Sequence, residues 1–180
     1  PDDDVVQVDH DNVGACRELV TVLFAKGIQN IAYLGSDMDQ MVNRCRYQGY
    51  EEAYRKGKRK LNQDLVYTDL SSRAMVEKAV EELKKSGVEC ILCQDDYICD
   101  EVVRKLSRMG VRIPDQMKVA SCHYSRILEN YPITITSLKF NITELGRRSC
   151  QVLLDMIHGK TVPDKTLLDY EIILKESTKG

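Results

Sequence analysis

Polar side chains gather in this sequence at the points where short apolar segments end. A carboxylate accepts two hydrogen bonds from vicinal hydroxyl groups, and a histidine can donate one and accept another. Brought together at one edge of a fold, these residue types could bind a small polar ligand such as a sugar. The candidate ligand-binding residues of this kind are Ser36, Asp69, Asp95, Asp96 and His123.

Arg46 adds a different kind of donor to this set. Its guanidinium can donate two parallel hydrogen bonds, and its place in a predicted helix over residues 38–56 puts it within reach of the same edge. As a lone residue it could equally be a surface ion-pair partner. Each aspartate or serine could likewise only cap the helix that follows it, although one cap needs only one of Asp95 and Asp96.

The sequence lacks the signatures of the common catalytic and cofactor sites. It has no G-x-G-x-x-G, P-loop, G-x-S-x-G or H-E-x-x-H motif. Cys90 and Cys93 have the C-x-x-C spacing of a redox or zinc site, but on a strand they would face opposite ways, about 10 Å apart. Cys122 and His123 are adjacent and so rarely face each other, which favours a packing cysteine beside a ligand-facing histidine. The sequence therefore predicts no enzyme, no metal site and no cofactor.

The elements that must position these residues alternate between strands and helices. Short apolar runs predict strands over residues 5–8, 30–34, 65–68, 88–93, 118–121, 133–138, 165–168 and 171–174. Apolar positions at helical spacing predict helices over residues 13–26, 38–56, 73–85, 96–109 and 142–157. Strands joined by helices pair in parallel, so their polar ends meet at one edge, where open sheets bind ligands. The predicted fold class is α/β, a doubly wound parallel sheet.

Composition limits the classes to which the chain can belong. The 180 residues are 43% hydrophobic and 30% charged, which is typical of a globular domain. The net charge of -2 gives no reason to expect that this segment itself holds nucleic acid. No apolar run approaches the roughly 20 residues of a membrane span, and the first residues do not resemble an export signal. Seven cysteines within apolar segments favour a reducing compartment, so we expect a cytoplasmic protein without a membrane partner.

Several segments, in this order and spacing, resemble one known family. They are VDHDNVGA, GIQNIAYLG, RYQGYEEA, the run from ILCQDD to KVAS, PITITSLKFNITELGRRSC and EIILKEST. Together they resemble the lactose/galactose repressor (LacI/GalR) family of bacterial transcription regulators over nearly the whole chain. The resemblance implies a periplasmic-binding-protein-like (type I) domain that forms a homodimer and binds a small-molecule effector between two lobes. It also implies contact with operator DNA only through an N-terminal helix-turn-helix, which this sequence does not contain.

The resemblance also implies roles for individual positions. Arg46, within RYQGY, matches the arginine that grips effector hydroxyl groups. Asp95 matches an asparagine or aspartate that contacts the ligand, and Asp96 lies beside it. His123 stands where the family usually has an aspartate, which extends the candidate effectors to modified or acidic sugars.

The resemblance further divides the chain between the two lobes. Residues 11–138 with 170–180 should form the complete second lobe, whereas 1–10 and 139–169 should form part of the first. The helix over residues 142–157 would then lack much of the sheet that covers it in the family. We expect its apolar stripe to pack against a second copy or against chain outside these 180 residues. The stripe consists of Leu145, Val152, Leu153 and Ile157.

Two other functions stay open beside the regulator. A solute-binding protein of a sugar transporter would share the fold, and a sugar-modifying enzyme could use the same sheet. The lack of catalytic motifs disfavours the enzyme, and the unpaired cysteines disfavour an exported protein. A helix-turn-helix encoded upstream would select the regulator, whose usual dimer interface matches Asp100 and residues 126–133. A signal peptide there would select the transporter protein.

Overall fold

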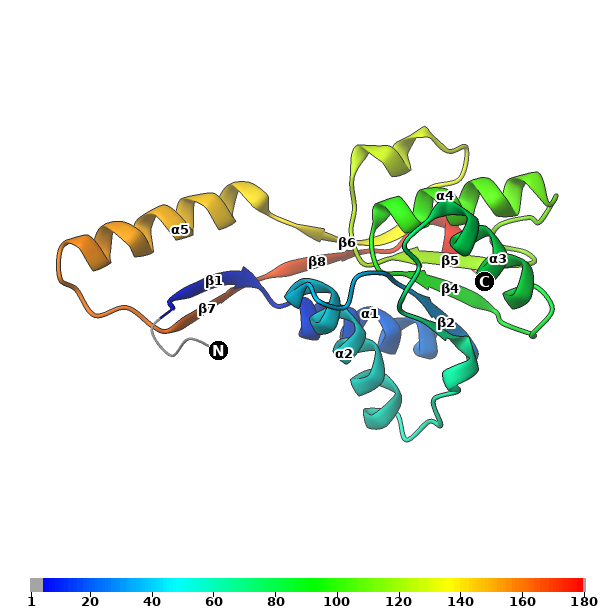
Figure 1. Ribbon diagram of the computed structural model, residues 1–180, viewed down its shortest axis with the longest axis horizontal. Coiled ribbons are helices and arrows are strands. Elements are labelled where there is room, and N and C mark those ends of the chain that lie inside the picture. Colours follow the sequence, from blue (N-terminus) through cyan, green and yellow to red (C-terminus); the bar gives the residue numbers. More distant parts are fainter. Residues whose placement is uncertain (1–4, 180) are drawn as a thin grey trace.

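The computed structural model describes residues 5–179, which build one six-stranded and one two-stranded sheet (Figure 1). The strands are β1 (Gln7–His10), β2 (Ile31–Leu34), β3 (Val66–Tyr67), β4 (Cys90–Cys93), β5 (Lys118–Ser121), β6 (Thr136–Phe140), β7 (Lys165–Leu168) and β8 (Tyr170–Ile173). The helices are α1 (Asn12–Ala25), α2 (Met41–Lys56), α3 (Arg73–Leu83), α4 (Asp96–Arg108) and α5 (Ile142–Ile157). Short 3₁₀ turns lie at Gln63–Leu65, Arg126–Asn130 and Glu176–Thr178. The predicted α/β class is confirmed.

The larger sheet has the strand order β3-β2-β4-β5-β6-β8. The strands from β3 to β6 pair in parallel, and β8 pairs antiparallel with β6 at the edge. The chain runs from β2 outward to β3 and then returns to β4 on the other side of β2. The strand order therefore reverses between β2 and β4, and open α/β sheets bind ligands at such a reversal, beyond the carboxyl ends of the strands.

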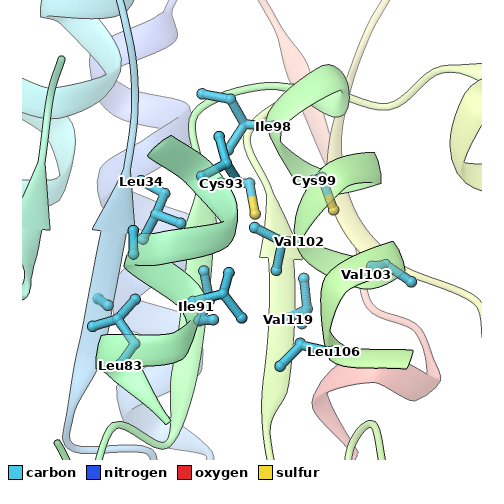
Figure 2. Close-up of a cluster of buried hydrophobic side chains, with 14 of the residues drawn as sticks. Leu34, Leu83, Ile91, Cys93, Ile98, Cys99, Val102, Val103, Leu106 and Val119 are labelled. Carbon is cyan, nitrogen blue, oxygen red and sulfur yellow. The ribbon is translucent and has the colours of Figure 1, made fainter. Parts of the chain in front are cut away.

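Helices cover both faces of the larger sheet because successive strand side chains point to opposite sides. Tyr33 packs with α1 and α2, whereas its neighbour Leu34 packs with α3 and α4. Two clusters of buried side chains result, the first with Tyr33 and the second with Leu34. Figure 2 shows the second cluster, in which side chains of α3 and α4 lie against the sheet. Cys90 belongs to the first cluster and Cys93 to the second, so the predicted separation of the C-x-x-C pair is confirmed.

Several predicted boundaries are wrong by two or three residues, for identifiable reasons. The first strand is shifted toward the C-terminus, because His10 pairs with Leu168 of β7. The strand predicted over 133–138 starts later, because Thr134 bonds instead with the C-terminal turn: its N–H and hydroxyl both donate to Glu176. The helix predicted from residue 38 begins at Met41, after a turn.

The smaller sheet pairs β1 with β7 in parallel, and α5 packs on β1 (Figure 1). A hollow of about 500 Å³ between them is lined by Val5, Val6, Val8, Ser149, Val152, Leu153 and Met156. In the predicted apolar stripe Val152 is buried, but Leu153 is 56% exposed and Ile157 is 69% exposed. The two-stranded sheet uses residues from the predicted first lobe, whereas the six-stranded sheet uses residues from the predicted second lobe and also Lys139 and Phe140 at the end of β6. The lobe division itself stays a prediction, and residues 1–4 and 180 of it lie outside the described residues.

We expect a polypeptide limited to these 180 residues to self-associate, because the apolar face of α5 would otherwise contact water. Light scattering after size-exclusion chromatography measures this directly. The matched control is the double variant Leu153→Glu with Ile157→Glu, which places charges on the exposed face and should yield a monomer. A wild-type chain that stays monomeric at high concentration would contradict the expectation.

Within residues 5–179, no helix combines the length and the apolar character needed to cross a membrane.

Candidate functional site

The carboxyl ends of β2, β4 and β5 lie side by side at one edge of the larger sheet. The register pairs Leu34 with Cys93, and Cys93 with Ser121, so the segments after these strands start level with one another. Ser36, the Asp95–Asp96 pair and His123 follow these three positions. The predicted convergence of these residues at one edge therefore agrees with the topology, although their role in binding stays a prediction.

Arg46 points from α2 into this edge and is only 8% exposed. Its Nη1 donates to the backbone oxygen of Gln94 at 3.0 Å, and its Nε donates to Oδ1 of Asn12 at 3.4 Å. Among residues 5–179, no carboxylate lies within salt-bridge distance of its guanidinium. The interpretation as a surface ion-pair partner is therefore wrong, and Arg46 instead joins α2 to the start of α1 and the end of β4.

Gln94 is a second buried polar residue at this edge, with a fully buried side chain. Its Oε1 accepts hydrogen bonds from the backbone N–H of Ser36 at 3.2 Å and from the Tyr33 hydroxyl at 3.4 Å. Its Nε2 finds no hydrogen-bond partner within residues 5–179. A buried amide donor without an acceptor is costly, so Gln94 holds Ser36 and Tyr33 at this edge at the expense of one unsatisfied N–H group.

The two adjacent aspartates have different tasks. Asp95 caps α4, because its Oδ1 accepts from the backbone N–H of Ile98 at 2.8 Å. Asp96 is buried and accepts hydrogen bonds from the Ser125 hydroxyl and from Nδ1 of His123, the latter at 3.2 Å. Burial is the largest single influence on Asp96 and raises its pKa, but the hydrogen bonds from Ser125 and His123 together hold that pKa below its usual value. Asp96 thus stays ionised and orients the His123 ring.

The Asp96 interactions predict an acid-sensitive contribution to stability. A carboxyl with a pKa lowered by folding stabilises the protein above its unfolded pKa, about 3.9 for aspartate, and this contribution is lost as the pH falls through the folded value. The unfolding free energy of wild type minus that of Asp96→Asn should therefore be largest above about pH 5 and shrink below about pH 4. Urea unfolding across this range is the measurement, and Ser125→Ala should weaken the pH dependence. A difference that is constant from neutral pH to pH 3 would contradict this role.

Three aromatic rings form a column beside these residues, which we call the ring column: His10, Phe140 and His123. The His123 and Phe140 rings are nearly parallel, at 17°, with centroids 6.4 Å apart. The His10 ring lies 4.8 Å from Phe140 at a tilt of 48°. His10 is 5% exposed, and its Nε2 has no hydrogen-bond partner in the described part of the chain.

The remaining candidates, Ser36, Asp69 and Cys122, contribute less to this edge of the sheet. Ser36 takes part through its backbone, since its carbonyl also accepts from Nδ2 of Asn43 at 3.1 Å. Asp69 follows the neighbouring strand β3, is exposed, and makes no hydrogen bond with other residues of the described range. Cys122 packs against Cys16, with the sulfur atoms 3.6 Å apart, and burial raises the pKa of the Cys16 thiol. The prediction that Cys122 is a packing residue is confirmed.

Sequence reasoning missed three residues of this edge as contributors: His10, Asn12 and Phe140. Gln94 is recognisable from the sequence as a polar side chain at a strand end. His10 and Phe140 end β1 and β6, and their contact arises only when two distant segments cross.

A neighbouring hollow of about 650 Å³ is lined by Phe140, Asn141, Ile142, Leu168 and Asp169, among others.

The donors and acceptors of this edge suit a neutral or weakly charged polyhydroxylated ligand. Arg46 supplies a charged donor, Asp95 supplies a carboxylate, and His123 supplies a ring nitrogen. Within residues 5–179, no cluster of three or more histidine, cysteine or acidic side chains could hold a metal ion.

The chain is similar to known proteins over most of its length. Residues 20–178 match the family model of the periplasmic binding protein-like domain. HTH-type transcriptional regulator CelR of Thermobifida fusca is 27% identical over 180 residues, which cover 98% of this chain and 53% of that protein. HTH-type transcriptional regulator GntR of Escherichia coli K12 is 25% identical over 169 residues, which cover 90% of this chain and 49% of that protein. The chain spans about half the length of these curated relatives.

Solved structures agree with the fold. The transcriptional regulator CelR–cellobiose complex is 26% identical with a TM-score of 0.86, and the match covers 98% of this chain and 55% of that one. A putative transcriptional regulator LacI from Bacillus cereus is 25% identical with a TM-score of 0.84, and the match covers 99% of this chain and 64% of that one.

Proposed function

The chain belongs to the family of periplasmic binding protein-like domains, and from this premise we propose that it senses an effector and mediates dimerisation in a bacterial transcription regulator of the LacI/GalR type. The curated relatives support this class, since they are HTH-type transcriptional regulators and not enzymes. Operator DNA would be bound by an N-terminal helix-turn-helix encoded upstream of these residues. Such a protein would act in the cytoplasm and need no cofactor.

The observation that carries the proposal is the setting of Arg46. Its guanidinium is nearly buried at the strand-order reversal, yet its described acceptors are one backbone carbonyl and one long contact to an amide oxygen. A buried cation without a carboxylate partner keeps donor capacity for a ligand oxygen. The Gln94 carbonyl, which accepts from Nη1, fixes the guanidinium at the end of β4.

We propose that the effector is a small polyhydroxylated compound, a sugar or a sugar derivative. Arg46 would donate to its oxygens, whereas Asp95 would accept from its hydroxyl groups. Asp96 would act mainly by orienting His123, and Ser36 and Asp69 would lie at the rim. CelR, one of the relatives, is described as a complex with cellobiose, which makes cellobiose a first compound to test.

A solute-binding protein of a sugar transporter is the alternative, because the same family of domains gives it the same fold. The reported relatives favour the regulator. The upstream coding sequence distinguishes the two, since a helix-turn-helix selects the regulator and a signal peptide selects the transporter protein.

The test is a thermal-shift screen on the full-length protein with mono- and disaccharides, their acids and their phosphates, beginning with cellobiose. A ligand at 100 times its dissociation constant stabilises the folded state by about 2.7 kcal/mol, which raises the melting temperature by a few degrees. The active compound should also change binding to a DNA fragment from the protein's own promoter region. The absence of any stabilising compound, together with no DNA binding, would contradict the proposal.

A further inference from the structure

We infer that Phe140 is a positioning residue, which transmits a change at His123 to the segments that join the two sheets. This inference deepens the proposed function, because it rests on the effector site and names the route by which that site would control the hinge. Phe140 need not touch the effector. Its role follows from the ring column and from the way the chain crosses between the sheets.

Within residues 5–179 the chain passes between the two sheets three times, after β1, after β6 and between β7 and β8 (Figure 1). The crossing segments are tied together by backbone contacts. The N–H of Asp11 donates to the Leu168 carbonyl at 3.2 Å, and Phe140 lies opposite Tyr170 in the β6–β8 pair. Any rotation of one sheet against the other must therefore change the geometry at all three crossings.

The ring column connects these crossings with the effector site. Asp96 holds Nδ1 of His123, which leaves Nε2 as the ring atom available to a ligand. The Phe140 ring is nearly parallel to His123, at 17°, and it lies against His10 with centroids 4.8 Å apart. His10 and Phe140 are the last residues of β1 and β6, so two of the three rings lie where the chain crosses between the sheets.

Close packing couples the orientations of the three rings. His10 is 5% exposed, so its ring cannot turn without displacing the Phe140 ring that packs on it. An effector oxygen that binds Nε2 of His123 would fix that ring, and Phe140 would then favour one arrangement of β1 and β6. The binding energy of the effector would thereby shift the equilibrium between different arrangements of the two sheets.

The test is a double-variant cycle read by amide hydrogen exchange in the full-length protein, and it requires no effector. The reporter is the Asp11 amide, whose hydrogen bond to Leu168 spans two crossings. His123→Asn should change the Asp11 exchange rate about fivefold when Phe140 is present, but less than about twofold in a Phe140→Leu background. Phe140→Tyr keeps the ring and should restore the full effect of His123→Asn.

Two controls separate transmission from general loosening. Tyr170→Leu removes an aromatic ring directly across from Phe140, outside the ring column, and should leave the effect of His123→Asn unchanged. The Lys118 amide, which donates to Glu89 at the opposite edge of the sheet, should respond equally little in every variant. An equal effect of His123→Asn with and without Phe140, or its loss in Tyr170→Leu, would overturn the inference. A failed sugar screen would count against the proposed function alone, because the cycle does not use a sugar.

Discussion

Replacing Arg46 by alanine is expected to abolish the response of the full-length regulator to its effector while the protein still folds. The substitution removes a nearly buried donor that lies at the strand-order reversal. Hydrogen bonds from a charged donor contribute about 1.5–3 kcal/mol each, so the loss of two to the effector would weaken binding by a factor on the order of 100 or more. The fold should lose about 2–4 kcal/mol, since the Gln94 carbonyl and the Asn12 amide oxygen each lose one donor.

Two measurements check this result. Calorimetric titration with the compound found in the thermal-shift screen gives the affinity, and a reporter gene gives the response. The matched control is Arg44→Ala, which removes the same charge from the exposed side of the same helix, where Arg44 only donates to the Met38 and Asp39 carbonyls. An Arg46→Ala protein with wild-type affinity and response would remove Arg46 from the site.

Gly49→Val on α2 is expected to cause a large loss of stability. A Cβ atom at Gly49 would lie 2.4 Å from the Val13 carbonyl oxygen and 2.9 Å from Cβ of Cys16. Both distances are far shorter than van der Waals contact, so α1 and α2 would have to separate. Overpacking of this kind costs about 1–3 kcal/mol and more where backbone must move, so we expect about 3 kcal/mol or more.

Denaturant unfolding measures this loss, and a second glycine provides the control. Gly146 lies within α5, where an added Cβ would meet nothing within 4 Å. Gly146→Ala should therefore raise stability by about 0.5–1 kcal/mol, because alanine favours a helix interior over glycine. Substitutions at Gly49 and Gly146 that change stability equally would contradict the close contact between α1 and α2.

The core of the fold was predictable because its signals are local. The four-residue cores of β2 and β4 are entirely apolar, and such runs indicate strands that are buried on both faces. The ends of α1 and α4 carry aspartate caps at Asp11 and Asp95, as their sequence pattern indicates. The relatives also confirm the resemblance to LacI/GalR regulators that these segments predicted.

The site was predictable only in part, because its geometry depends on contacts between distant segments. The sequence placed Asp95 and Asp96 together, but it could not reveal that one caps a helix while the other holds His123. The partners of Arg46 come from the start of α1 and the end of β4, and helical spacing in α2 says nothing about either. The boundaries of β1 and β6 were likewise set by pairing with β7 and with the C-terminal turn.

The pairing of β1 with β7 has a consequence for how this chain is made. β1 leaves the ribosome near the beginning of these residues and β7 near their end, so at 5–20 residues per second β1 waits on the order of ten seconds for its partner. During that interval β1 lacks its β7 partner, whereas β2 and β4 can already pair. The smaller sheet and the antiparallel β6–β8 edge of the larger sheet are therefore completed only after β7 and β8 have been synthesised, later than the parallel core.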